Sequence, residues 1–174
     1  MTFDARQRLH HMAGVDLTVL EGIEESTALV VLSEIGTDMS RWPREKHFGS
    51  WLGLAPNPKK SGGKVKSSAT RPGVNRAAQA LRLAAKNLQR SRSALGAFFR
   101  RIAARRGLAK AITATAYKLA RIIYAMLKHG TAYVTQGLAV YEMAYRERMV
   151  RQMKHKAAEL GLVIVEPEAV AQPA

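Results

Sequence analysis

The sequence of 174 residues contains no cysteine, which excludes a disulfide framework and a thiolate metal site. It has no apolar run near the roughly 20 residues that a membrane-spanning helix needs. Its first residues, MTFDARQRLHHMAG, lack the apolar core of a secretory signal peptide. With 47% hydrophobic and 24% charged residues, the composition is not that of a collagen-like, mucin-like or fully disordered chain. The sequence therefore predicts one folded domain, with or without appendages, in the cytoplasm.

Acidic residues are absent from the centre of the chain. Between Glu45 and Glu142 there is no carboxylate, whereas the same stretch holds 19 Lys or Arg, and the whole chain has a formal net charge of +15. Uncompensated positive charge repels itself, so we expect a polyanionic partner. Nucleic acid fits best, because each cation placed on a phosphate releases a counterion. The alternatives are a solvated basic surface and, less well supported, a membrane surface, for which the basic helices lack an apolar face rich in Trp and Phe.

Hydrophobic periodicity predicts a mostly α-helical, multi-helix fold, with one long basic loop between two helical halves. The expected helices cover residues 1–13, 27–35, 43–52, 74–89, 94–105, 108–129 and 141–160, with a helical turn at 17–20. We also expect a turn at 135–137, a short strand at 162–165 and a disordered tail from residue 167.

This pattern divides the chain into an N-terminal polar helix (1–13), a central domain (14–134), and a peripheral helix with a flexible tail (135–174). The central domain contains a part that resembles a helix-hairpin-helix (14–36), a basic loop (53–73) and a helical part (74–134). In a helix-hairpin-helix, two glycines let backbone N–H groups approach a DNA phosphate. Here Glu24 occupies the second glycine position and Glu25 follows it, so we interpret this hairpin as structural rather than as a DNA contact.

The basic loop carries the most chemical feature of the chain, the run Pro58-Lys-Lys-Ser61-Gly-Gly-Lys64. Adjacent glycines permit a tight turn beside the Ser61 hydroxyl, and lysines surround that hydroxyl. A serine can attack a phosphodiester when nearby cations stabilise the charge on phosphorus. From these residues alone, a flexible phosphate-contacting loop is the stronger interpretation and a nucleophile the weaker one. The segment is either irregular or a short hairpin, and it is not a Walker A loop.

Further cations follow this loop. Arg71 and Asn75 lie near the start of the expected helix, where a phosphate would be favoured. Arg76 and Arg82 are six residues apart and therefore lie on different faces of that helix. A second cluster is either a nucleic-acid contact or a solvated helix end: Arg100, Arg101, Arg105 and Arg106.

Metal ligands are scarce. The five histidines have no metal-binding spacing, and the basic stretch offers no carboxylates for a metal-dependent nuclease. Tyr117 or Tyr124 could serve a tyrosine recombinase, but the sequence lacks an activating H-x-x-R, and we interpret both as core or groove residues. We expect no cofactor bound by this chain.

Many short segments, in order and in spacing, resemble the insertion-sequence transposases of the group numbered one-ten, with one-sixteen and nine-oh-two. The matching segments are Gly14-Val-Asp16-Leu-Thr, Gly22-Ile23, Thr27-Ala28, Leu32-Ser-Glu34-Ile35-Gly36, His47-Phe48, Trp51-Leu-Gly53-Leu, Ser61-Gly-Gly63-Lys, Asn75-Arg76, Ala80-Leu81-Arg82, Ala111-Ile112 and Lys118-Leu119-Ala120-Arg121. The resemblance is to the C-terminal transposase domain of that family and covers about residues 14–134.

The resemblance implies a site-specific DNA recombinase with a serine nucleophile, for which the matching residue is Ser61. It implies that Ser61 attacks a DNA phosphate and forms a phosphoserine intermediate, with Gly62 and Gly63 shaping its turn. It also implies a guide RNA and at least a dimer, because recombination must hold two duplexes. The residues expected to hold the scissile phosphate or to contact nucleic acid nearby are Lys59, Lys60, Lys64, Lys66, Arg71, Asn75, Arg76 and Arg82.

This sequence departs from the family in two places. Full-length members carry an N-terminal RuvC-like domain whose Asp-Glu-Asp-Asp set binds magnesium, and this sequence begins just before the transposase domain. We therefore expect a truncated or split product, with magnesium only where a RuvC-like domain is supplied elsewhere. The alternative is a non-enzymatic DNA- or RNA-binding remnant that regulates a full-length transposase. In addition, the run from Thr70 to Asn75 replaces a common Lys-Arg-Gly-Asn run.

Overall fold

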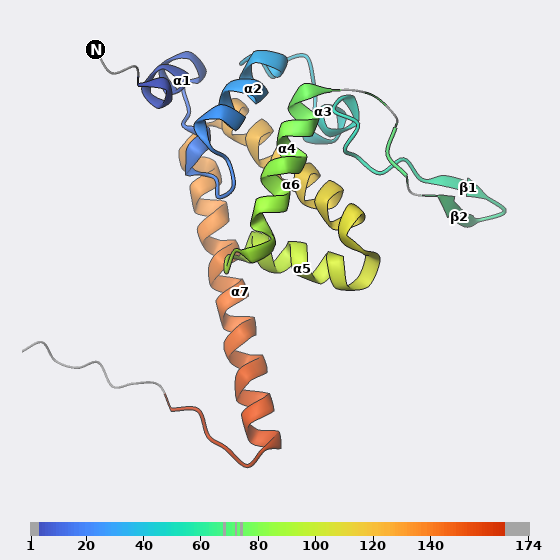
Figure 1. Cartoon of the computed structure of the whole chain (residues 1–174), viewed down its shortest axis with the longest axis vertical. Helices are drawn as coiled ribbons and strands as arrows, with labels where there is room; N and C mark the ends of the chain where they lie inside the picture. Colours follow the sequence, from blue (N-terminus) through green and yellow to red (C-terminus); the bar gives the residue numbers. More distant parts are fainter. Residues whose placement is uncertain (1–3, 68, 72, 74, 166–174) are drawn as a thin grey trace, which may run out of the picture. The chain divides into compact units, whose positions relative to one another are not determined.

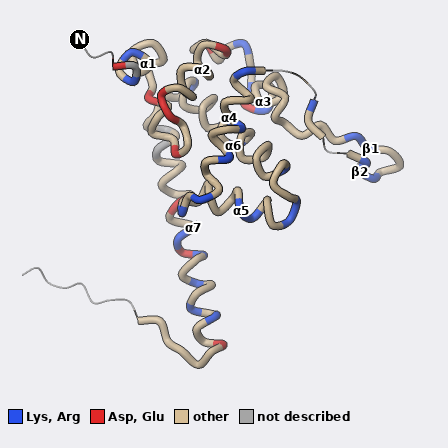
Figure 2. Tube along the Cα trace, viewed as in Figure 1, with Lys and Arg blue, Asp and Glu red and all other residues tan. Residues whose placement is uncertain are grey.

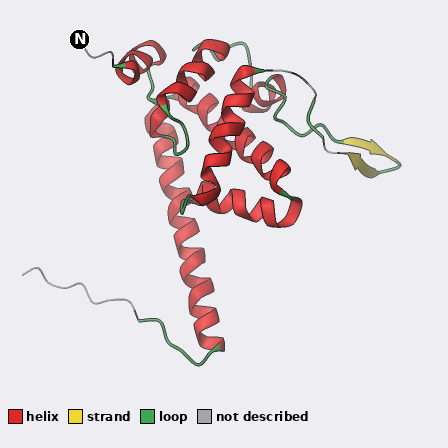
Figure 3. Cartoon of the chain, viewed as in Figure 1, coloured by secondary structure: helices red, strands yellow, loops and turns green. Residues whose placement is uncertain are grey.

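The computed structural model describes residues 4–67, 69–71, 73 and 75–165, and it is mostly helical, as predicted (Figures 1 and 3). The chain divides into two units, residues 1–137 and 138–174. The elements are α1 (Ala5–Ala13), η1 (Leu17–Val19), α2 (Glu25–Ile35), α3 (Glu45–Trp51), β1 (Lys59–Ser61), β2 (Lys64–Ser67), α4 (Arg76–Asn87), η2 (Leu88–Arg90), α5 (Ala94–Arg106), α6 (Leu108–His129) and α7 (Thr131–Glu159).

Helix α6 is the centre of the first unit, because α3, α4 and α5 all pack against it, while α2 packs on α4. Its buried stripe includes Leu119, Ile123 and Met126, which are spaced three and four residues apart and are fully buried. Phe48 of α3 and Phe99 of α5 are equally buried. Each such side chain contributes about 1.5–3 kcal/mol by leaving water, so these helices hold the unit together.

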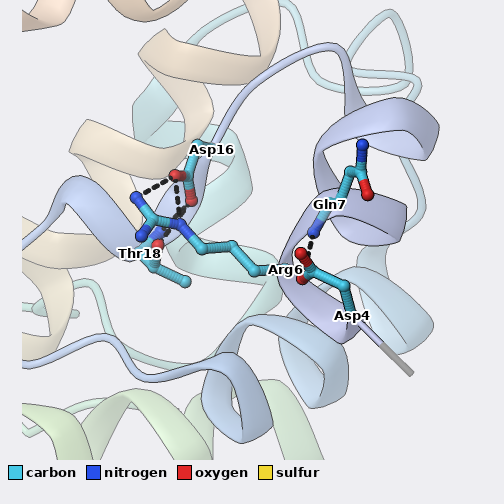
Figure 4. Close-up of polar contacts among 5 residues, drawn as sticks. All are labelled: Asp4, Arg6, Gln7, Asp16 and Thr18. Carbon is cyan, nitrogen blue, oxygen red and sulfur yellow. Dashed lines mark hydrogen bonds and ion pairs between the residues drawn. The ribbon is translucent and has the colours of Figure 1, made fainter. Parts of the chain in front are cut away.

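The N-terminal residues are tied to the unit by polar contacts around Asp16 (Figure 4). Arg6 of α1 donates to the Asp16 carboxylate at 2.8 Å, and the Thr18 hydroxyl donates to it at 2.6 Å. Partial burial disfavours the charged form of Asp16, but the hydrogen bonds from Thr18 and Arg6 outweigh it and lower the pKa of that carboxyl. Asp4 caps α1 by accepting from the Gln7 amide at 3.0 Å.

In the segment 14–36, Gly22 packs closely against helix α4. The helix expected before the hairpin is the short 3₁₀ turn η1, and α2 follows the hairpin. Gly22 has φ +87°, and a Cβ there would lie 3.0 Å from the Ala84 carbonyl oxygen of α4. This glycine therefore faces the backbone of α4, which supports the structural interpretation of the hairpin over a DNA contact.

Two local predictions in the second half of the chain are wrong. No turn forms at residues 135–137, because α7 continues through them and includes Gly137. A single glycine costs a helix about 1 kcal/mol relative to alanine, which does not suffice to end it. Residues 162–165 are described and form no strand. The tail from residue 167 lies outside the described residues, and within them no helix is long and apolar enough to cross a membrane.

Candidate nucleic-acid interface

The serine loop is a β-hairpin that projects from the helices of the first unit (Figures 1 and 3). β1 and β2 are antiparallel, and Gly62 and Gly63 alone connect them. Both glycines have positive φ, +56° and +73°, as a type I′ turn requires. The sequence left open whether this segment is irregular or a short hairpin, and the structure shows a hairpin.

Ser61 is the last residue of β1 and is exposed. It pairs with Lys64 across the turn, so the two side chains lie on one face of the hairpin with their Cβ atoms about 5 Å apart. Lys60 pairs with Val65 and therefore stands on the other face. Of the three lysines next to Ser61 in sequence, the register thus brings Lys64 closest to its hydroxyl.

A β-bulge determines where the other two lysines of the hairpin, Lys59 and Lys66, lie. Lys59 pairs with Ser67 although Lys60 pairs with Val65, so Lys66 is the extra residue of β2. Lys59 and Lys66 are both exposed. The hairpin therefore presents positive charge on both faces and at the bulge, rather than one ring of lysines around the hydroxyl.

The root of the hairpin lies at the end of α3. Pro56 and Thr70 form a β-bridge, and the Asn57 amide donates to the Ala69 carbonyl at 3.2 Å. Gly53 has φ +67°, and a Cβ there would come within 3.3 Å of the Arg71 carbonyl oxygen. Arg71 is thus at the root, whereas Ser61 is five residues from Pro56, roughly 16 Å of extended strand. The structure does not bring Arg71 beside Ser61.

Helix α4 positions the other three predicted residues. The Asn75 side chain caps the helix by accepting from the Ala78 amide at 2.9 Å. Arg76 forms an ion pair with Glu34 of α2 at 3.4 Å and remains mostly exposed. Arg82 is half-buried on the same helix. Asn75 and Arg76 therefore have structural uses. The sequence does not predict Glu34 as the counter-ion of Arg76, because no local pattern links these two positions. Pro72 and Val74, in the run that departs from the family, lie outside the described residues.

Charge is segregated within the first unit. All of its carboxylates belong to residues 4–45, so residues 46–137 contribute Lys and Arg but no acidic residue to the unit (Figure 2). Glu45 of α3 pairs with Arg121 of α6, whose Nε lies 2.8 Å from the carboxylate. That side-chain hydrogen bond raises the pKa of Arg121, although partial burial opposes it. The hairpin itself has no acidic residue, and its lysines face solvent.

The tyrosines considered as nucleophiles lie in or against the α3–α6 contact. Tyr124 is buried and donates its hydroxyl to the Trp42 carbonyl at 2.7 Å. Tyr117 lies against Gly49, where a Cβ would collide with its ring. Within the described residues, no three His, Asp or Glu side chains come together as a potential metal site.

The chain is matched by the sequence profile of a transposase family, over residues 14–100. The description of that family is Transposase IS116/IS110/IS902, and the chain belongs to it. It is also similar to a Streptomyces coelicolor protein named "Insertion element IS110 uncharacterized 43.6 kDa protein". The two are 32% identical over 133 residues, which cover 74% of this chain and 32% of the relative. The chain thus spans about a third of the length of that relative.

Proposed function

We propose that this chain is a DNA-transposition domain in which Ser61 is the nucleophile that cuts and rejoins DNA strands. The supporting observation is the position of Ser61: exposed at the closing pair of a tight two-glycine turn, with Lys64 directly opposite. A nucleophile must reach a phosphate in a duplex, and an exposed hairpin tip lets it do so. The family of the chain supports the same reaction class.

The chemistry is phosphoryl transfer to a hydroxyl. The Ser61 Oγ loses its proton to a base and forms a bond to phosphorus, while the bond from phosphorus to one sugar oxygen breaks. The released sugar oxygen takes up a proton. Attack on the phosphoserine by the sugar hydroxyl of another strand then forms a new phosphodiester and returns the proton to Ser61. No net hydrolysis occurs, so the energy of the phosphodiester is conserved.

Lysines of the hairpin stabilise this step electrostatically. Lys64 shares a face with Ser61 and is placed to neutralise the charge that develops on the phosphate oxygens. Lys60, on the opposite face, and Lys59 and Lys66 near the bulge would contact neighbouring phosphates. Arg71 at the root, with Arg76 and Arg82 on α4, would hold DNA further from the reacting atoms, while Gly62, Gly63 and Asn75 shape the backbone.

The hairpin provides no base for the Ser61 proton, because residues 59–67 include neither a carboxylate nor a histidine. The described residues also do not fit a magnesium site, so no step is assigned to a metal held by them. We propose that magnesium, where it takes part, is held by a RuvC-like domain supplied elsewhere, and that the base lies outside the hairpin. We further propose a guide RNA, assembly as at least a dimer, and action in the bacterial nucleoid.

Covalent trapping tests the nucleophile. The protein is mixed with end-labelled element-junction DNA and guide RNA, with and without a separately added RuvC-like domain, and then denatured. We expect a protein–DNA adduct that Ser61→Ala abolishes while DNA binding persists. Ser67→Ala is the matched control, because Ser67 lies on β2 of the same hairpin and should leave the adduct intact. An adduct that survives in Ser61→Ala would refute the assignment.

A non-enzymatic module that binds DNA or RNA and regulates a full-length transposase is the second candidate. The observation in its favour is that the hairpin has no carboxylate or histidine to take the Ser61 proton. Catalysis needs such a base, whereas binding does not. In that case no adduct forms under any condition, Ser61→Ala has no effect, and loss of lysines weakens binding. Steep salt dependence of binding is expected for both candidates.

A further inference from the structure

The α5–α6 pair has a set of cations that the hairpin chemistry does not use. Phe98 of α5 is half-buried and has two cations over its ring. The Arg101 Cζ lies 5.6 Å from the ring centroid, and the Lys118 Nζ of α6 lies 4.8 Å from it. Cation–π contacts of this kind restrict both side chains at little cost in desolvation. Two helices thus place positive charge around one aromatic ring.

Helical geometry extends this set along α5. Phe98, Arg101 and Arg105 are spaced three and four residues apart, so they share one face of the helix. Arg101 and Arg105 are both exposed, and their Cα atoms are about 6 Å apart along the axis. With Lys118, which shares the Phe98 ring with Arg101, they make up what we call the α5–α6 basic face: Phe98, Arg101, Arg105 and Lys118.

The neighbouring arginine has a different role. Arg100 donates to the Gln89 carbonyl at 3.1 Å and also to the Ser91 carbonyl, so it fastens the end of η2 to α5. The cluster seen in the sequence therefore separates into one arginine used by the fold and others facing solvent. Arg105 lies in the last turn of α5, where its charge interacts favourably with the helix dipole. This structural role is the alternative to a role in binding.

We infer that the α5–α6 basic face binds the phosphate backbone of duplex DNA, as a contact separate from the hairpin. The face lies within the stretch without carboxylates, so no acidic neighbour in sequence neutralises it. Arginine is weakly hydrated and suits phosphate, and anchoring on Phe98 reduces the side-chain entropy lost on binding. α5 and the hairpin occupy different parts of the first unit (Figures 1 and 2). This inference rests on the proposed function only in taking DNA as the partner.

Salt-dependent binding to a short DNA duplex of arbitrary sequence tests the face. The variant is Arg101→Gln with Arg105→Gln, and the control is Arg90→Gln with Arg92→Gln, which removes the same charge from exposed positions in the same stretch. Loss of two phosphate contacts should lower the slope of log K against log salt by about 1.8. At 0.1 M salt this corresponds to roughly 60-fold weaker binding, if the electrostatic contribution vanishes near 1 M.

A second variant on the other helix guards against a folding artefact. Lys118→Gln should lower the slope by about 0.9, and the control pair should lower it by much less. If Arg101→Gln with Arg105→Gln matches the control while Lys59→Gln with Lys60→Gln lowers the slope, the inference fails and the proposed function stands. If the unmodified protein binds DNA without salt dependence, the proposed function fails as well. If only RNA duplex binding is weakened, the face binds RNA and the inference is wrong.

Discussion

Gly96 lies inside α5, where glycine costs about 1 kcal/mol relative to alanine, so Gly96→Ala would stabilise an isolated helix. In the folded chain we expect the opposite. A Cβ at this position would lie 2.9 Å from the Leu88 carbonyl oxygen and closer still to the Ser91 carbonyl oxygen. Both obstacles are backbone atoms, which cannot rotate away. Such overpacking typically costs 1–3 kcal/mol or more.

The same collision would disturb the start of α5. The Gly96 amide donates to the Ser93 cap at 3.2 Å, and Arg100 donates to the Ser91 carbonyl. Losing the cap adds about 1 kcal/mol, so after the propensity gain we expect a net loss of roughly 1–3 kcal/mol. The assay is urea unfolding followed by far-UV circular dichroism. Gly137→Ala is the control, because a Cβ there meets nothing within 4 Å and should be neutral or stabilising. A Gly96→Ala protein as stable as the unmodified chain would refute the reasoning.

Two further predictions concern stability. Thr115→Val should raise the free energy of unfolding by roughly 1–2 kcal/mol, because the Thr115 hydroxyl is buried on α6 and has no hydrogen-bond partner among the described residues; a decrease in urea midpoint would contradict this. Asp16→Asn should remove an acid-sensitive part of stability. The folded-state pKa of Asp16 is lowered, so its contribution is present above the unfolded pKa of about 3.9 and is lost as pH falls through the folded value. Urea midpoints measured from pH 6 down to pH 2 should therefore fall less steeply in Asp16→Asn than in the unmodified chain.

The helical core was predictable because its periodicity is long and uninterrupted. The expected helix at 108–129 coincides with α6, and the one at 94–105 ends one residue before α5 does. In each, apolar residues recur at three and four positions over at least three turns, which only a helix accommodates. Gly137 misled the prediction because a lone glycine is a weak stop signal, here flanked by the good helix formers Gln136, Leu138 and Ala139.

The candidate site was only partly predictable, for a different reason. Ser61 and its lysines lie close in sequence, so composition alone indicated a basic loop around a hydroxyl. Which lysine faces the serine depends on strand register, which the two-residue turn at Gly62 and Gly63 sets, and the bulge between Lys59 and Lys60 moves only the pairs farther from that turn. The ion pair between Arg76 and Glu34 and the position of Arg71 at the hairpin root arise from tertiary packing. Neither leaves a local signal in the sequence.

Charge connects the fold with the proposed interface. Three carboxylates of the first unit pair with arginines and serve the fold: Asp16 with Arg6, Glu34 with Arg76 and Glu45 with Arg121. The last two ion pairs use Arg76 and Arg121, which are two of the 19 cations between Glu45 and Glu142. The hairpin and the α5–α6 basic face both lie in this stretch, whose excess of like charge opposes folding by self-repulsion. A polyanion bound across both would relieve that repulsion and stabilise the folded state, so the proposed binding would couple the stability of this domain to its occupancy by nucleic acid.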